Sequence, residues 1–260
     1  METKVTLNDT VALMRDLRKR CDWDAAQTHE SLRPYLIEEC HELDEAIRNA
    51  DPSLMREELG DVLLQVLFHS VIAEEREEFD ANDVAHGLIA KMKARHPHLY
   101  GEGAKEPWER MKSKKRRSIA DGLPLALPPL HRAHRLQDRA AGVGFDWPDT
   151  AGPIAKIEEE LAEVQEHLGG KERADPHAPP VLDAAHAELE AELGDLLFAC
   201  VNLCRKAGVH AALALDKANS KFEERFRGVE GLAAERGIDV RSAGLSLLDS
   251  LWDEVKTTRR

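Results

Sequence analysis

The sequence lacks the features that would place it in a membrane or in an oxidising compartment. No apolar run approaches the roughly 20 residues that a membrane-spanning helix needs, and residues 1–5 contain no apolar signal core. Cysteine is scarce, and the spacings of Cys21, Cys40, Cys200 and Cys204 fit neither a disulfide framework nor a zinc ribbon. We therefore expect a cytoplasmic protein with no membrane contact.

Basic residues are in the minority, with 36 Lys and Arg against 49 Asp and Glu and a formal net charge of −13. A nucleic-acid footprint needs clustered Lys and Arg to neutralise phosphates. The basic run at 112–117 is more simply explained as a solvated face or helix end. We expect no nucleic-acid partner.

Aromatic residues are also few, at 5% of the chain, whereas charged residues make up 33%. Together with the scarcity of Gly and Pro inside the periodic segments, this composition is typical of a helical protein. A length of 260 residues allows two domains, and the proline-rich stretch 121–129 has the composition of a linker. We predict an all-α protein with two helical-bundle domains, 1–120 and 130–260.

What the sequence does contain is paired carboxylates. Residues three apart on a helix stand one turn above each other on the same face, so Glu160 pairs with Glu163, and Glu192 with Asp195. The second pair lies in the apolar stretch 193–204, which we expect to form a buried helix. Because unpaired buried carboxylates are too costly to persist, we expect a hard, oxygen-seeking cation between the pairs, Mg²⁺ or Mn²⁺.

These features occur twice in the same order, which indicates an internal repeat. The acidic residues match at helical spacing: Glu39, Glu42, Glu58 and Asp61 in the first half, and Glu160, Glu163, Glu192 and Asp195 in the second. Two further pairs, each four residues apart, follow in each half: Lys91 with Arg95 and Trp108 with Lys112, then Lys221 with Arg225 and Trp252 with Lys256. We predict a tandem repeat, with a candidate second metal site at the first acidic set.

Carboxylates, basic side chains and an aromatic ring together suit a nucleoside triphosphate. Bound metal ions would bridge phosphate oxygens, Lys221 and Arg225 would neutralise the remaining charge, and the indole of Trp252 would stack on or beside the base. A carboxylate not fully used as a ligand, Glu159 or Glu163, would orient the water that attacks a phosphorus atom in line. A role for Trp252 as a packing anchor alone stays open.

The motif Glu-Glu-x-x-Glu followed by Glu-x-x-Asp, present twice, resembles the MazG family of nucleoside triphosphate pyrophosphohydrolases. The likeness extends over essentially the whole chain and includes residues 95–98, 144–147 and 217–226. The resemblance implies an all-α fold and a homodimer. It also implies Mg²⁺-dependent cleavage of many NTPs and dNTPs between the α- and β-phosphates, giving NMP and pyrophosphate, in a house-cleaning or starvation-linked role.

By the same resemblance, site residues are implied in the second half. The metal ligands would be Glu160, Glu163, Glu192 and Asp195. The residues in contact with the nucleotide would be Lys156, Glu159, Glu188, Lys221, Arg225, Trp252 and Lys256.

The two halves are not equivalent. Lys156 lies on the carboxylate face of its predicted helix, whereas the first half has Tyr35 at that position, and Glu188 corresponds to Leu54. Because the second half carries the fuller set of polar residues, we predict that it is the catalytic one.

Two other classes of protein stay open at this point. A di-iron or di-manganese bundle needs Glu-x-x-His with both side chains inward, but Glu38 and His41 point away from the apolar stripe, and the second half has Ala162 in place of His41. A non-catalytic helical adaptor would use the acidic helices only as a binding surface. Mg²⁺-dependent release of pyrophosphate from dNTPs distinguishes an enzyme from an adaptor.

Overall fold

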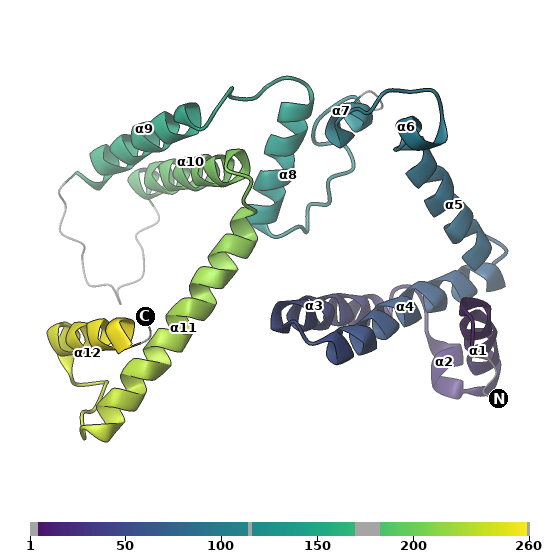
Figure 1. The fold of residues 1–260 in the computed structure, drawn as a ribbon, viewed down its shortest axis with the longest axis horizontal. Helices are drawn as coiled ribbons and strands as arrows, with labels where there is room; N and C mark the ends of the chain where they lie inside the picture. The colour runs from purple at the N-terminus through teal and green to yellow at the C-terminus, as the bar shows by residue number, and fades with distance from the viewer. Residues whose placement is uncertain (1–4, 114–115, 170–182, 259–260) are drawn as a thin grey trace. The chain divides into compact units, whose positions relative to one another are not determined.

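The computed structural model describes residues 5–113, 116–169 and 183–258, and every regular element in these ranges is a helix. The chain divides into two compact units, Met1–Lys105 and Glu106–Arg260, and Figure 1 shows the helices of each. The predicted all-α fold is confirmed.

The first unit packs around two long helices. Its elements are α1 (Leu7–Arg20), α2 (Asp22–Ala26), α3 (Arg33–Asn49), α4 (Pro52–Glu75), α5 (Ala81–Ala94) and α6 (Pro97–Tyr100). Asp51 caps α4 by accepting hydrogen bonds from the backbone N–H groups of Ser53 and Leu54. Helices α3 and α4 lie side by side and α1 packs against α4, with Met14, Phe68 and Ile72 in the core. This pairing places the acidic residues of α3 next to those of α4.

The second unit repeats the paired long helices. Its elements are α7 (Trp108–Ser113), α8 (Pro129–Gly142), α9 (Ala151–Leu168), α10 (Ala184–Lys206), α11 (Ala211–Glu235) and α12 (Gly244–Thr258). Helix α9 packs along α10, and α8 packs against both α10 and α11. Helix α12 packs on the C-terminal half of α11, where Val229 and Ala233 meet Leu251 and Val255. Segment 170–182, between α9 and α10, lies outside the described residues.

The boundary between the units lies before the proline-rich stretch expected to separate them. Helix α7 belongs to the second unit because Glu109 accepts hydrogen bonds from Arg135 on α8 (2.6 Å) and from Arg116 (3.0 Å). The buried Arg139 of α8 donates to the backbone carbonyls of Ile119 and Asp121. These bonds attach the start of the predicted 121–129 linker to α8.

The apolar stretch 193–204 is helical, but the expectation that it is buried is wrong for the single chain. Of the residues in α10, Ala199 and Val201 are buried, whereas Leu193 and Leu197 are 42% and 58% exposed. Leu161 of α9 is also exposed. The two helices cover each other on one side only, so an apolar face of the pair stays open in the single chain.

No described helix is by itself both long and apolar enough to cross a membrane; the pair α10 and α11, bent by 101°, meets that test jointly on length and composition alone.

Candidate active site

Three of the predicted carboxylates meet where α9 packs along α10. Glu160 and Glu163 stand one turn apart on α9, and Glu192 faces them from α10. One carboxylate oxygen from each lies within 4.8 Å of the other two. Glu160 is buried, with 4% of its surface exposed. Oxygen ligands in this number and spacing suit a hard divalent cation.

The electrostatics of this cluster favour a cation. Burial raises the pKa of Glu163, and the neighbouring charges of Glu160 and Glu192 raise it further. Lys156 supplies part of the balancing charge, because its Nζ lies 2.6 Å from Oε1 of Glu160 and donates to Oε1 of Glu159 at 2.9 Å. These two bonds raise the pKa of Lys156. One ammonium group cannot compensate all of the clustered carboxylates.

The fourth predicted ligand, Asp195, lies on the wall of an adjoining cavity. The cavity has a volume of about 780 Å³ and lies wholly within the second unit, and Lys156 and Glu160 line it together with Asp195. Pockets of this size hold small organic ligands. The acidic cluster therefore opens onto a space that a nucleotide could enter.

Glu188, one turn before Glu192 on α10, lies near the C-terminal end of α9. Nδ1 of His167 is 3.9 Å from Glu188 and Nε2 is 3.9 Å from Glu192. The imidazole of His167 therefore lies beside both carboxylates.

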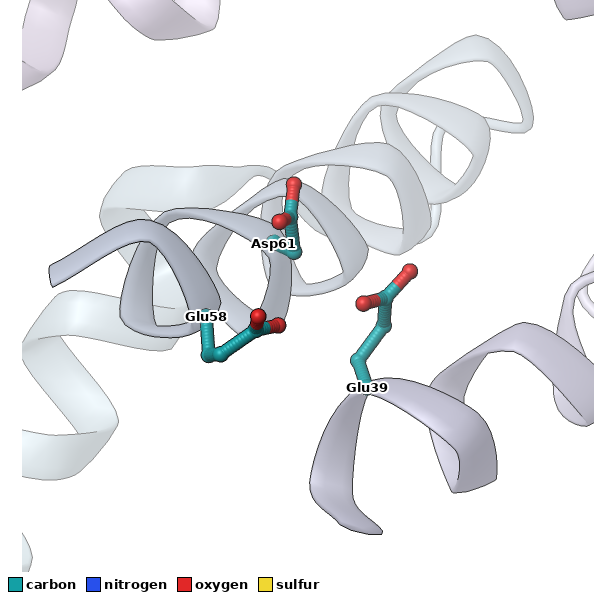
Figure 2. Close-up of side chains that lie close together, drawn as sticks. All are labelled: Glu39, Glu58 and Asp61. Carbon is teal, nitrogen blue, oxygen red and sulfur yellow. The ribbon is translucent and has the colours of Figure 1, made fainter. Parts of the chain in front are cut away.

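The first unit contains a similar acidic cluster. Glu39 of α3 approaches Glu58 and Asp61 of α4, with one carboxylate oxygen of each within 4.8 Å of the other two, and Figure 2 shows the three side chains close together. Burial raises the pKa of Glu39, and the charges of Asp61 and Glu42 add to the shift. The two clusters share two positions of the predicted repeat, since Glu39 and Glu58 correspond to Glu160 and Glu192. The third member differs, because Asp61 corresponds to Asp195 and not to Glu163.

The predicted basic and aromatic residues form a separate group on α11 and α12. The guanidinium of Arg225 lies 5.9 Å from the ring centroid of Trp252, whose indole packs against Phe222 at 5.3 Å. Lys256 pairs with Asp253, and Lys221 lies one turn before Arg225 on α11. Among the described residues, no hydrogen bond, ion pair or ring contact joins this group to the carboxylates of α9 and α10.

The corner between α10 and α11 accounts for this separation. Asp195 lies eleven residues before the end of α10, and Lys221 lies ten residues after the start of α11. With the helices bent by 101°, the backbones at these two residues are about 20 Å apart. Among the described residues of a single chain, the basic group therefore lies apart from the carboxylates of α9 and α10.

Comparison with known proteins identifies the family to which this chain belongs. Residues 27–100 match the family model described as the MazG nucleotide pyrophosphohydrolase domain. The chain is 43% identical over 265 residues to the nucleoside triphosphate pyrophosphohydrolase/pyrophosphatase MazG of Thermotoga maritima, covering 98% of this chain and 97% of that protein. The chain belongs to the MazG family. A second member, the nucleoside triphosphate pyrophosphohydrolase of Escherichia coli, is 40% identical over 256 residues, with 94% of this chain and 93% of that protein covered.

Sequence reasoning did not assign the other walls of the cavity in this MazG chain. Phe145 and Trp147 line it from the segment before α9, and Phe198 and Asn202 line it from α10. Gln137 of α8 also lines it. Residues 144–147 carry part of the family resemblance, yet their aromatic side chains follow no helical period, so spacing alone could not place them beside the carboxylates.

Proposed function

We propose that the chain, a member of a family of nucleoside triphosphate pyrophosphohydrolases, cleaves NTPs and dNTPs between the α- and β-phosphates to give NMP and pyrophosphate. The observation that carries this proposal is the convergence of Glu160, Glu163 and Glu192 beside a nucleotide-sized cavity, whose wall includes Glu160. The relatives from Thermotoga maritima and Escherichia coli, both named as nucleoside triphosphate pyrophosphohydrolases, support the same class of reaction.

The cluster fits the Mg²⁺ that the proposal requires, with Mn²⁺ as a substitute. Glu160, Glu163 and Glu192 would hold the ions together with Asp195, since all four offer hard oxygen ligands. Burial raises the pKa of Glu163, and repulsion from Glu160 and Glu192 raises it further. A cation would relieve that repulsion. Bound Mg²⁺ would supply charge neutralisation of the phosphates and a water of lowered pKa.

The side chains around the cluster can perform the remaining steps. Lys156 is partly exposed beside Glu160 and would attract a phosphate oxygen at the cavity mouth. Glu159 is more than half exposed and already accepts a hydrogen bond from Lys156, which places a free carboxylate oxygen where it can orient the attacking water and take its proton. Lys221 and Arg225 would neutralise the departing pyrophosphate.

The open apolar face of α9 and α10 supports a homodimer. Leu193 and Leu197 of α10 and Leu161 of α9 are exposed in the single chain, and apolar side chains grouped in this way mark interaction surfaces. A second copy would cover them through a symmetric contact. We further propose that such a dimer brings α11 of one chain to the carboxylates of the other.

Broad use of bases would suit the removal of surplus or damaged nucleotides. We therefore assign the chain a house-cleaning or starvation-linked role in the cytoplasm, where nucleoside triphosphates are made and consumed.

Product identification tests the assigned bond. All eight standard NTPs and dNTPs would be incubated with the full chain and Mg²⁺, and the phosphorus products followed by ³¹P nuclear magnetic resonance. We expect NMP and pyrophosphate in equal amounts and no reaction when a chelator removes the divalent ion. Release of orthophosphate from the γ-position would show that a different anhydride bond is cleaved.

A further inference from the structure

A smaller cavity of the second unit lies between the end of α7 and the last turns of α8. Its volume is about 230 Å³, below the roughly 300–1,000 Å³ of pockets that hold drug-sized ligands. Arg116, Arg117 and Arg139 line it, together with Ser113 and Ser118. None of its described lining residues is acidic. In a chain with a net charge of −13, this arginine pocket is a local concentration of positive charge.

Close packing of α7 on α8 forms the arginine pocket. A Cβ at position 142 would lie 3.0 Å from Cβ of Glu109, so the end of α8 meets α7 with no side chain of Gly142 between them. The carboxylate of Glu109 accepts hydrogen bonds from Arg135 of α8 at 2.6 Å and from Arg116 at 3.0 Å. These contacts attach both α7 and Arg116 to α8, so the walls of the pocket are in place before a ligand binds.

Arg139 brings a buried guanidinium that is only partly hydrogen-bonded. The residue is 7% exposed, and its Nη1 donates to the carbonyls of Ile119 at 2.7 Å and Asp121 at 2.9 Å. Its Nε is buried and has no hydrogen-bond partner among the described residues, and a buried donor left unpaired is costly. Nε and Nη2 together form the edge with which a guanidinium binds an oxyanion through two parallel bonds. After a small side-chain adjustment, an anion in the pocket would satisfy that edge.

The charges around Arg139 also favour an anion. Burial lowers the pKa of Arg139, and the like charges of Arg116 and Arg135 lower it further. The carboxylates of Glu109 and Asp121 oppose this shift without cancelling it. The surroundings therefore destabilise the positive charge of Arg139, and a bound anion would stabilise it.

Two further donors of the pocket are available to a ligand. Oδ2 of Asp121 accepts hydrogen bonds from the backbone N–H groups of Arg117 and Ser118, at 3.0 and 2.9 Å. The guanidinium of Arg117 itself makes no hydrogen bond or ion pair with the described residues. Oγ of Ser118 accepts from the N–H of Ala120 at 3.2 Å, which leaves the hydroxyl hydrogen of Ser118 to donate. The nearby carboxylate thus orders the loop and does not neutralise the Arg117 side chain.

We propose that the arginine pocket binds a small phosphate-class anion, held between Arg117 and Arg139 with the hydroxyl of Ser118 as a further donor. The phosphate group would belong to orthophosphate or to pyrophosphate, because the volume is too small for a whole nucleotide. Ile119 lines both this pocket and the larger cavity, whereas Arg117 and Arg139 line only the pocket. The anion site is therefore next to the candidate active site but separate from its carboxylates.

Isothermal titration calorimetry of the full chain tests this site, with orthophosphate and pyrophosphate in separate titrations and a chelator present to remove divalent ions. We expect binding of at least one anion, with the same affinity in Glu160→Gln. Arg117→Ala should weaken that binding about tenfold or more, because it removes hydrogen bonds between charged groups, and the exposed position of Arg117 should allow normal folding. The matched control is Arg110→Ala, which removes an exposed arginine of α7 outside the pocket and should leave the affinity unchanged.

Arg139→Lys gives a second variant, which keeps the charge but removes the two-bond edge of the guanidinium, and circular dichroism shows whether its helices are retained. We expect it to weaken anion binding as Arg117→Ala does. The anion that binds more tightly to the unaltered chain identifies the ligand. No binding of either anion, equal affinity in Arg117→Ala and the unaltered chain, or loss of binding in Glu160→Gln would overturn the site. A failure of the proposed hydrolase function would leave this result intact, because the titrations contain neither nucleotide nor divalent ion.

Discussion

Replacing Glu160 with alanine is expected to lower kcat for dNTP hydrolysis by at least about a hundredfold, because each lost ligand weakens the charge stabilisation that a divalent ion supplies. The equivalent change Glu39→Ala in the first unit is expected to change kcat by no more than a few fold. Both residues belong to acidic clusters. Of the two residues, only Glu160 lines the cavity that Lys156 and the aromatic side chains of Phe145 and Trp147 also line. Steady-state kinetics with dATP and Mg²⁺ measures both effects.

The isosteric variants Glu160→Gln and Glu39→Gln control for lost packing, since each keeps the side-chain volume and removes the charge. Circular dichroism of each variant shows whether the helices are retained. Equal losses of activity after changes at Glu160 and Glu39 would contradict the assignment of catalysis to the second unit.

Mixing two inactive variants is expected to restore activity. The chains carrying Glu160→Ala and Arg225→Ala are each damaged in a different group, one on α9 and one on α11. If α11 of one chain serves the carboxylates of its partner, a mixed dimer contains one intact site and one doubly damaged site. With random exchange of subunits, about a quarter of the original activity should return.

The matched control mixes Glu160→Ala with Glu163→Ala. Both changes lie on α9 and affect the same cluster, so no arrangement of the two chains yields an intact site and no activity should return. Tagged subunits would show that the chains exchange under the conditions used. If the mixture of Glu160→Ala and Arg225→Ala then recovers no activity, both groups belong to the site of a single chain.

The helices of this protein were largely predictable from sequence because local signals set them. Helix α1, for example, begins at a capping box formed by Thr6 and Asp9, a signal carried by neighbouring residues. The i, i+3 spacing of Glu160 and Glu163 was enough to place both on one face of α9. Packing of α9 on α10 then brings Glu192 close to both carboxylates. The sequence predicted this convergence because the two acidic pairs were expected to share a cation.

Other features depend on contacts that have no local signature. The boundary between units is set by Glu109 and by the buried Arg139, whose partners are remote in sequence. The position of Phe145 and Trp147 on the cavity wall depends on the hydrogen bond from Arg205 to Asp146, two residues that are 59 positions apart in the sequence. The stripe that was expected to be buried is open at Leu197, because hydrophobic periodicity shows which face is apolar but not whether the same chain covers it.

The most direct test of the account measures divalent ion binding at the carboxylates of α9 and α10. Mn²⁺ would be titrated into the full chain by electron paramagnetic resonance, with and without the α,β-methylene analogue of dATP. We expect Mn²⁺ to bind, and we expect the analogue to strengthen that binding. The analogue should no longer strengthen Mn²⁺ binding in Glu163→Gln or Glu192→Gln, but should still do so in Glu58→Gln of the first unit. Mn²⁺ binding that the analogue strengthens equally in Glu163→Gln and in the unaltered chain would contradict a metal-held triphosphate at this site.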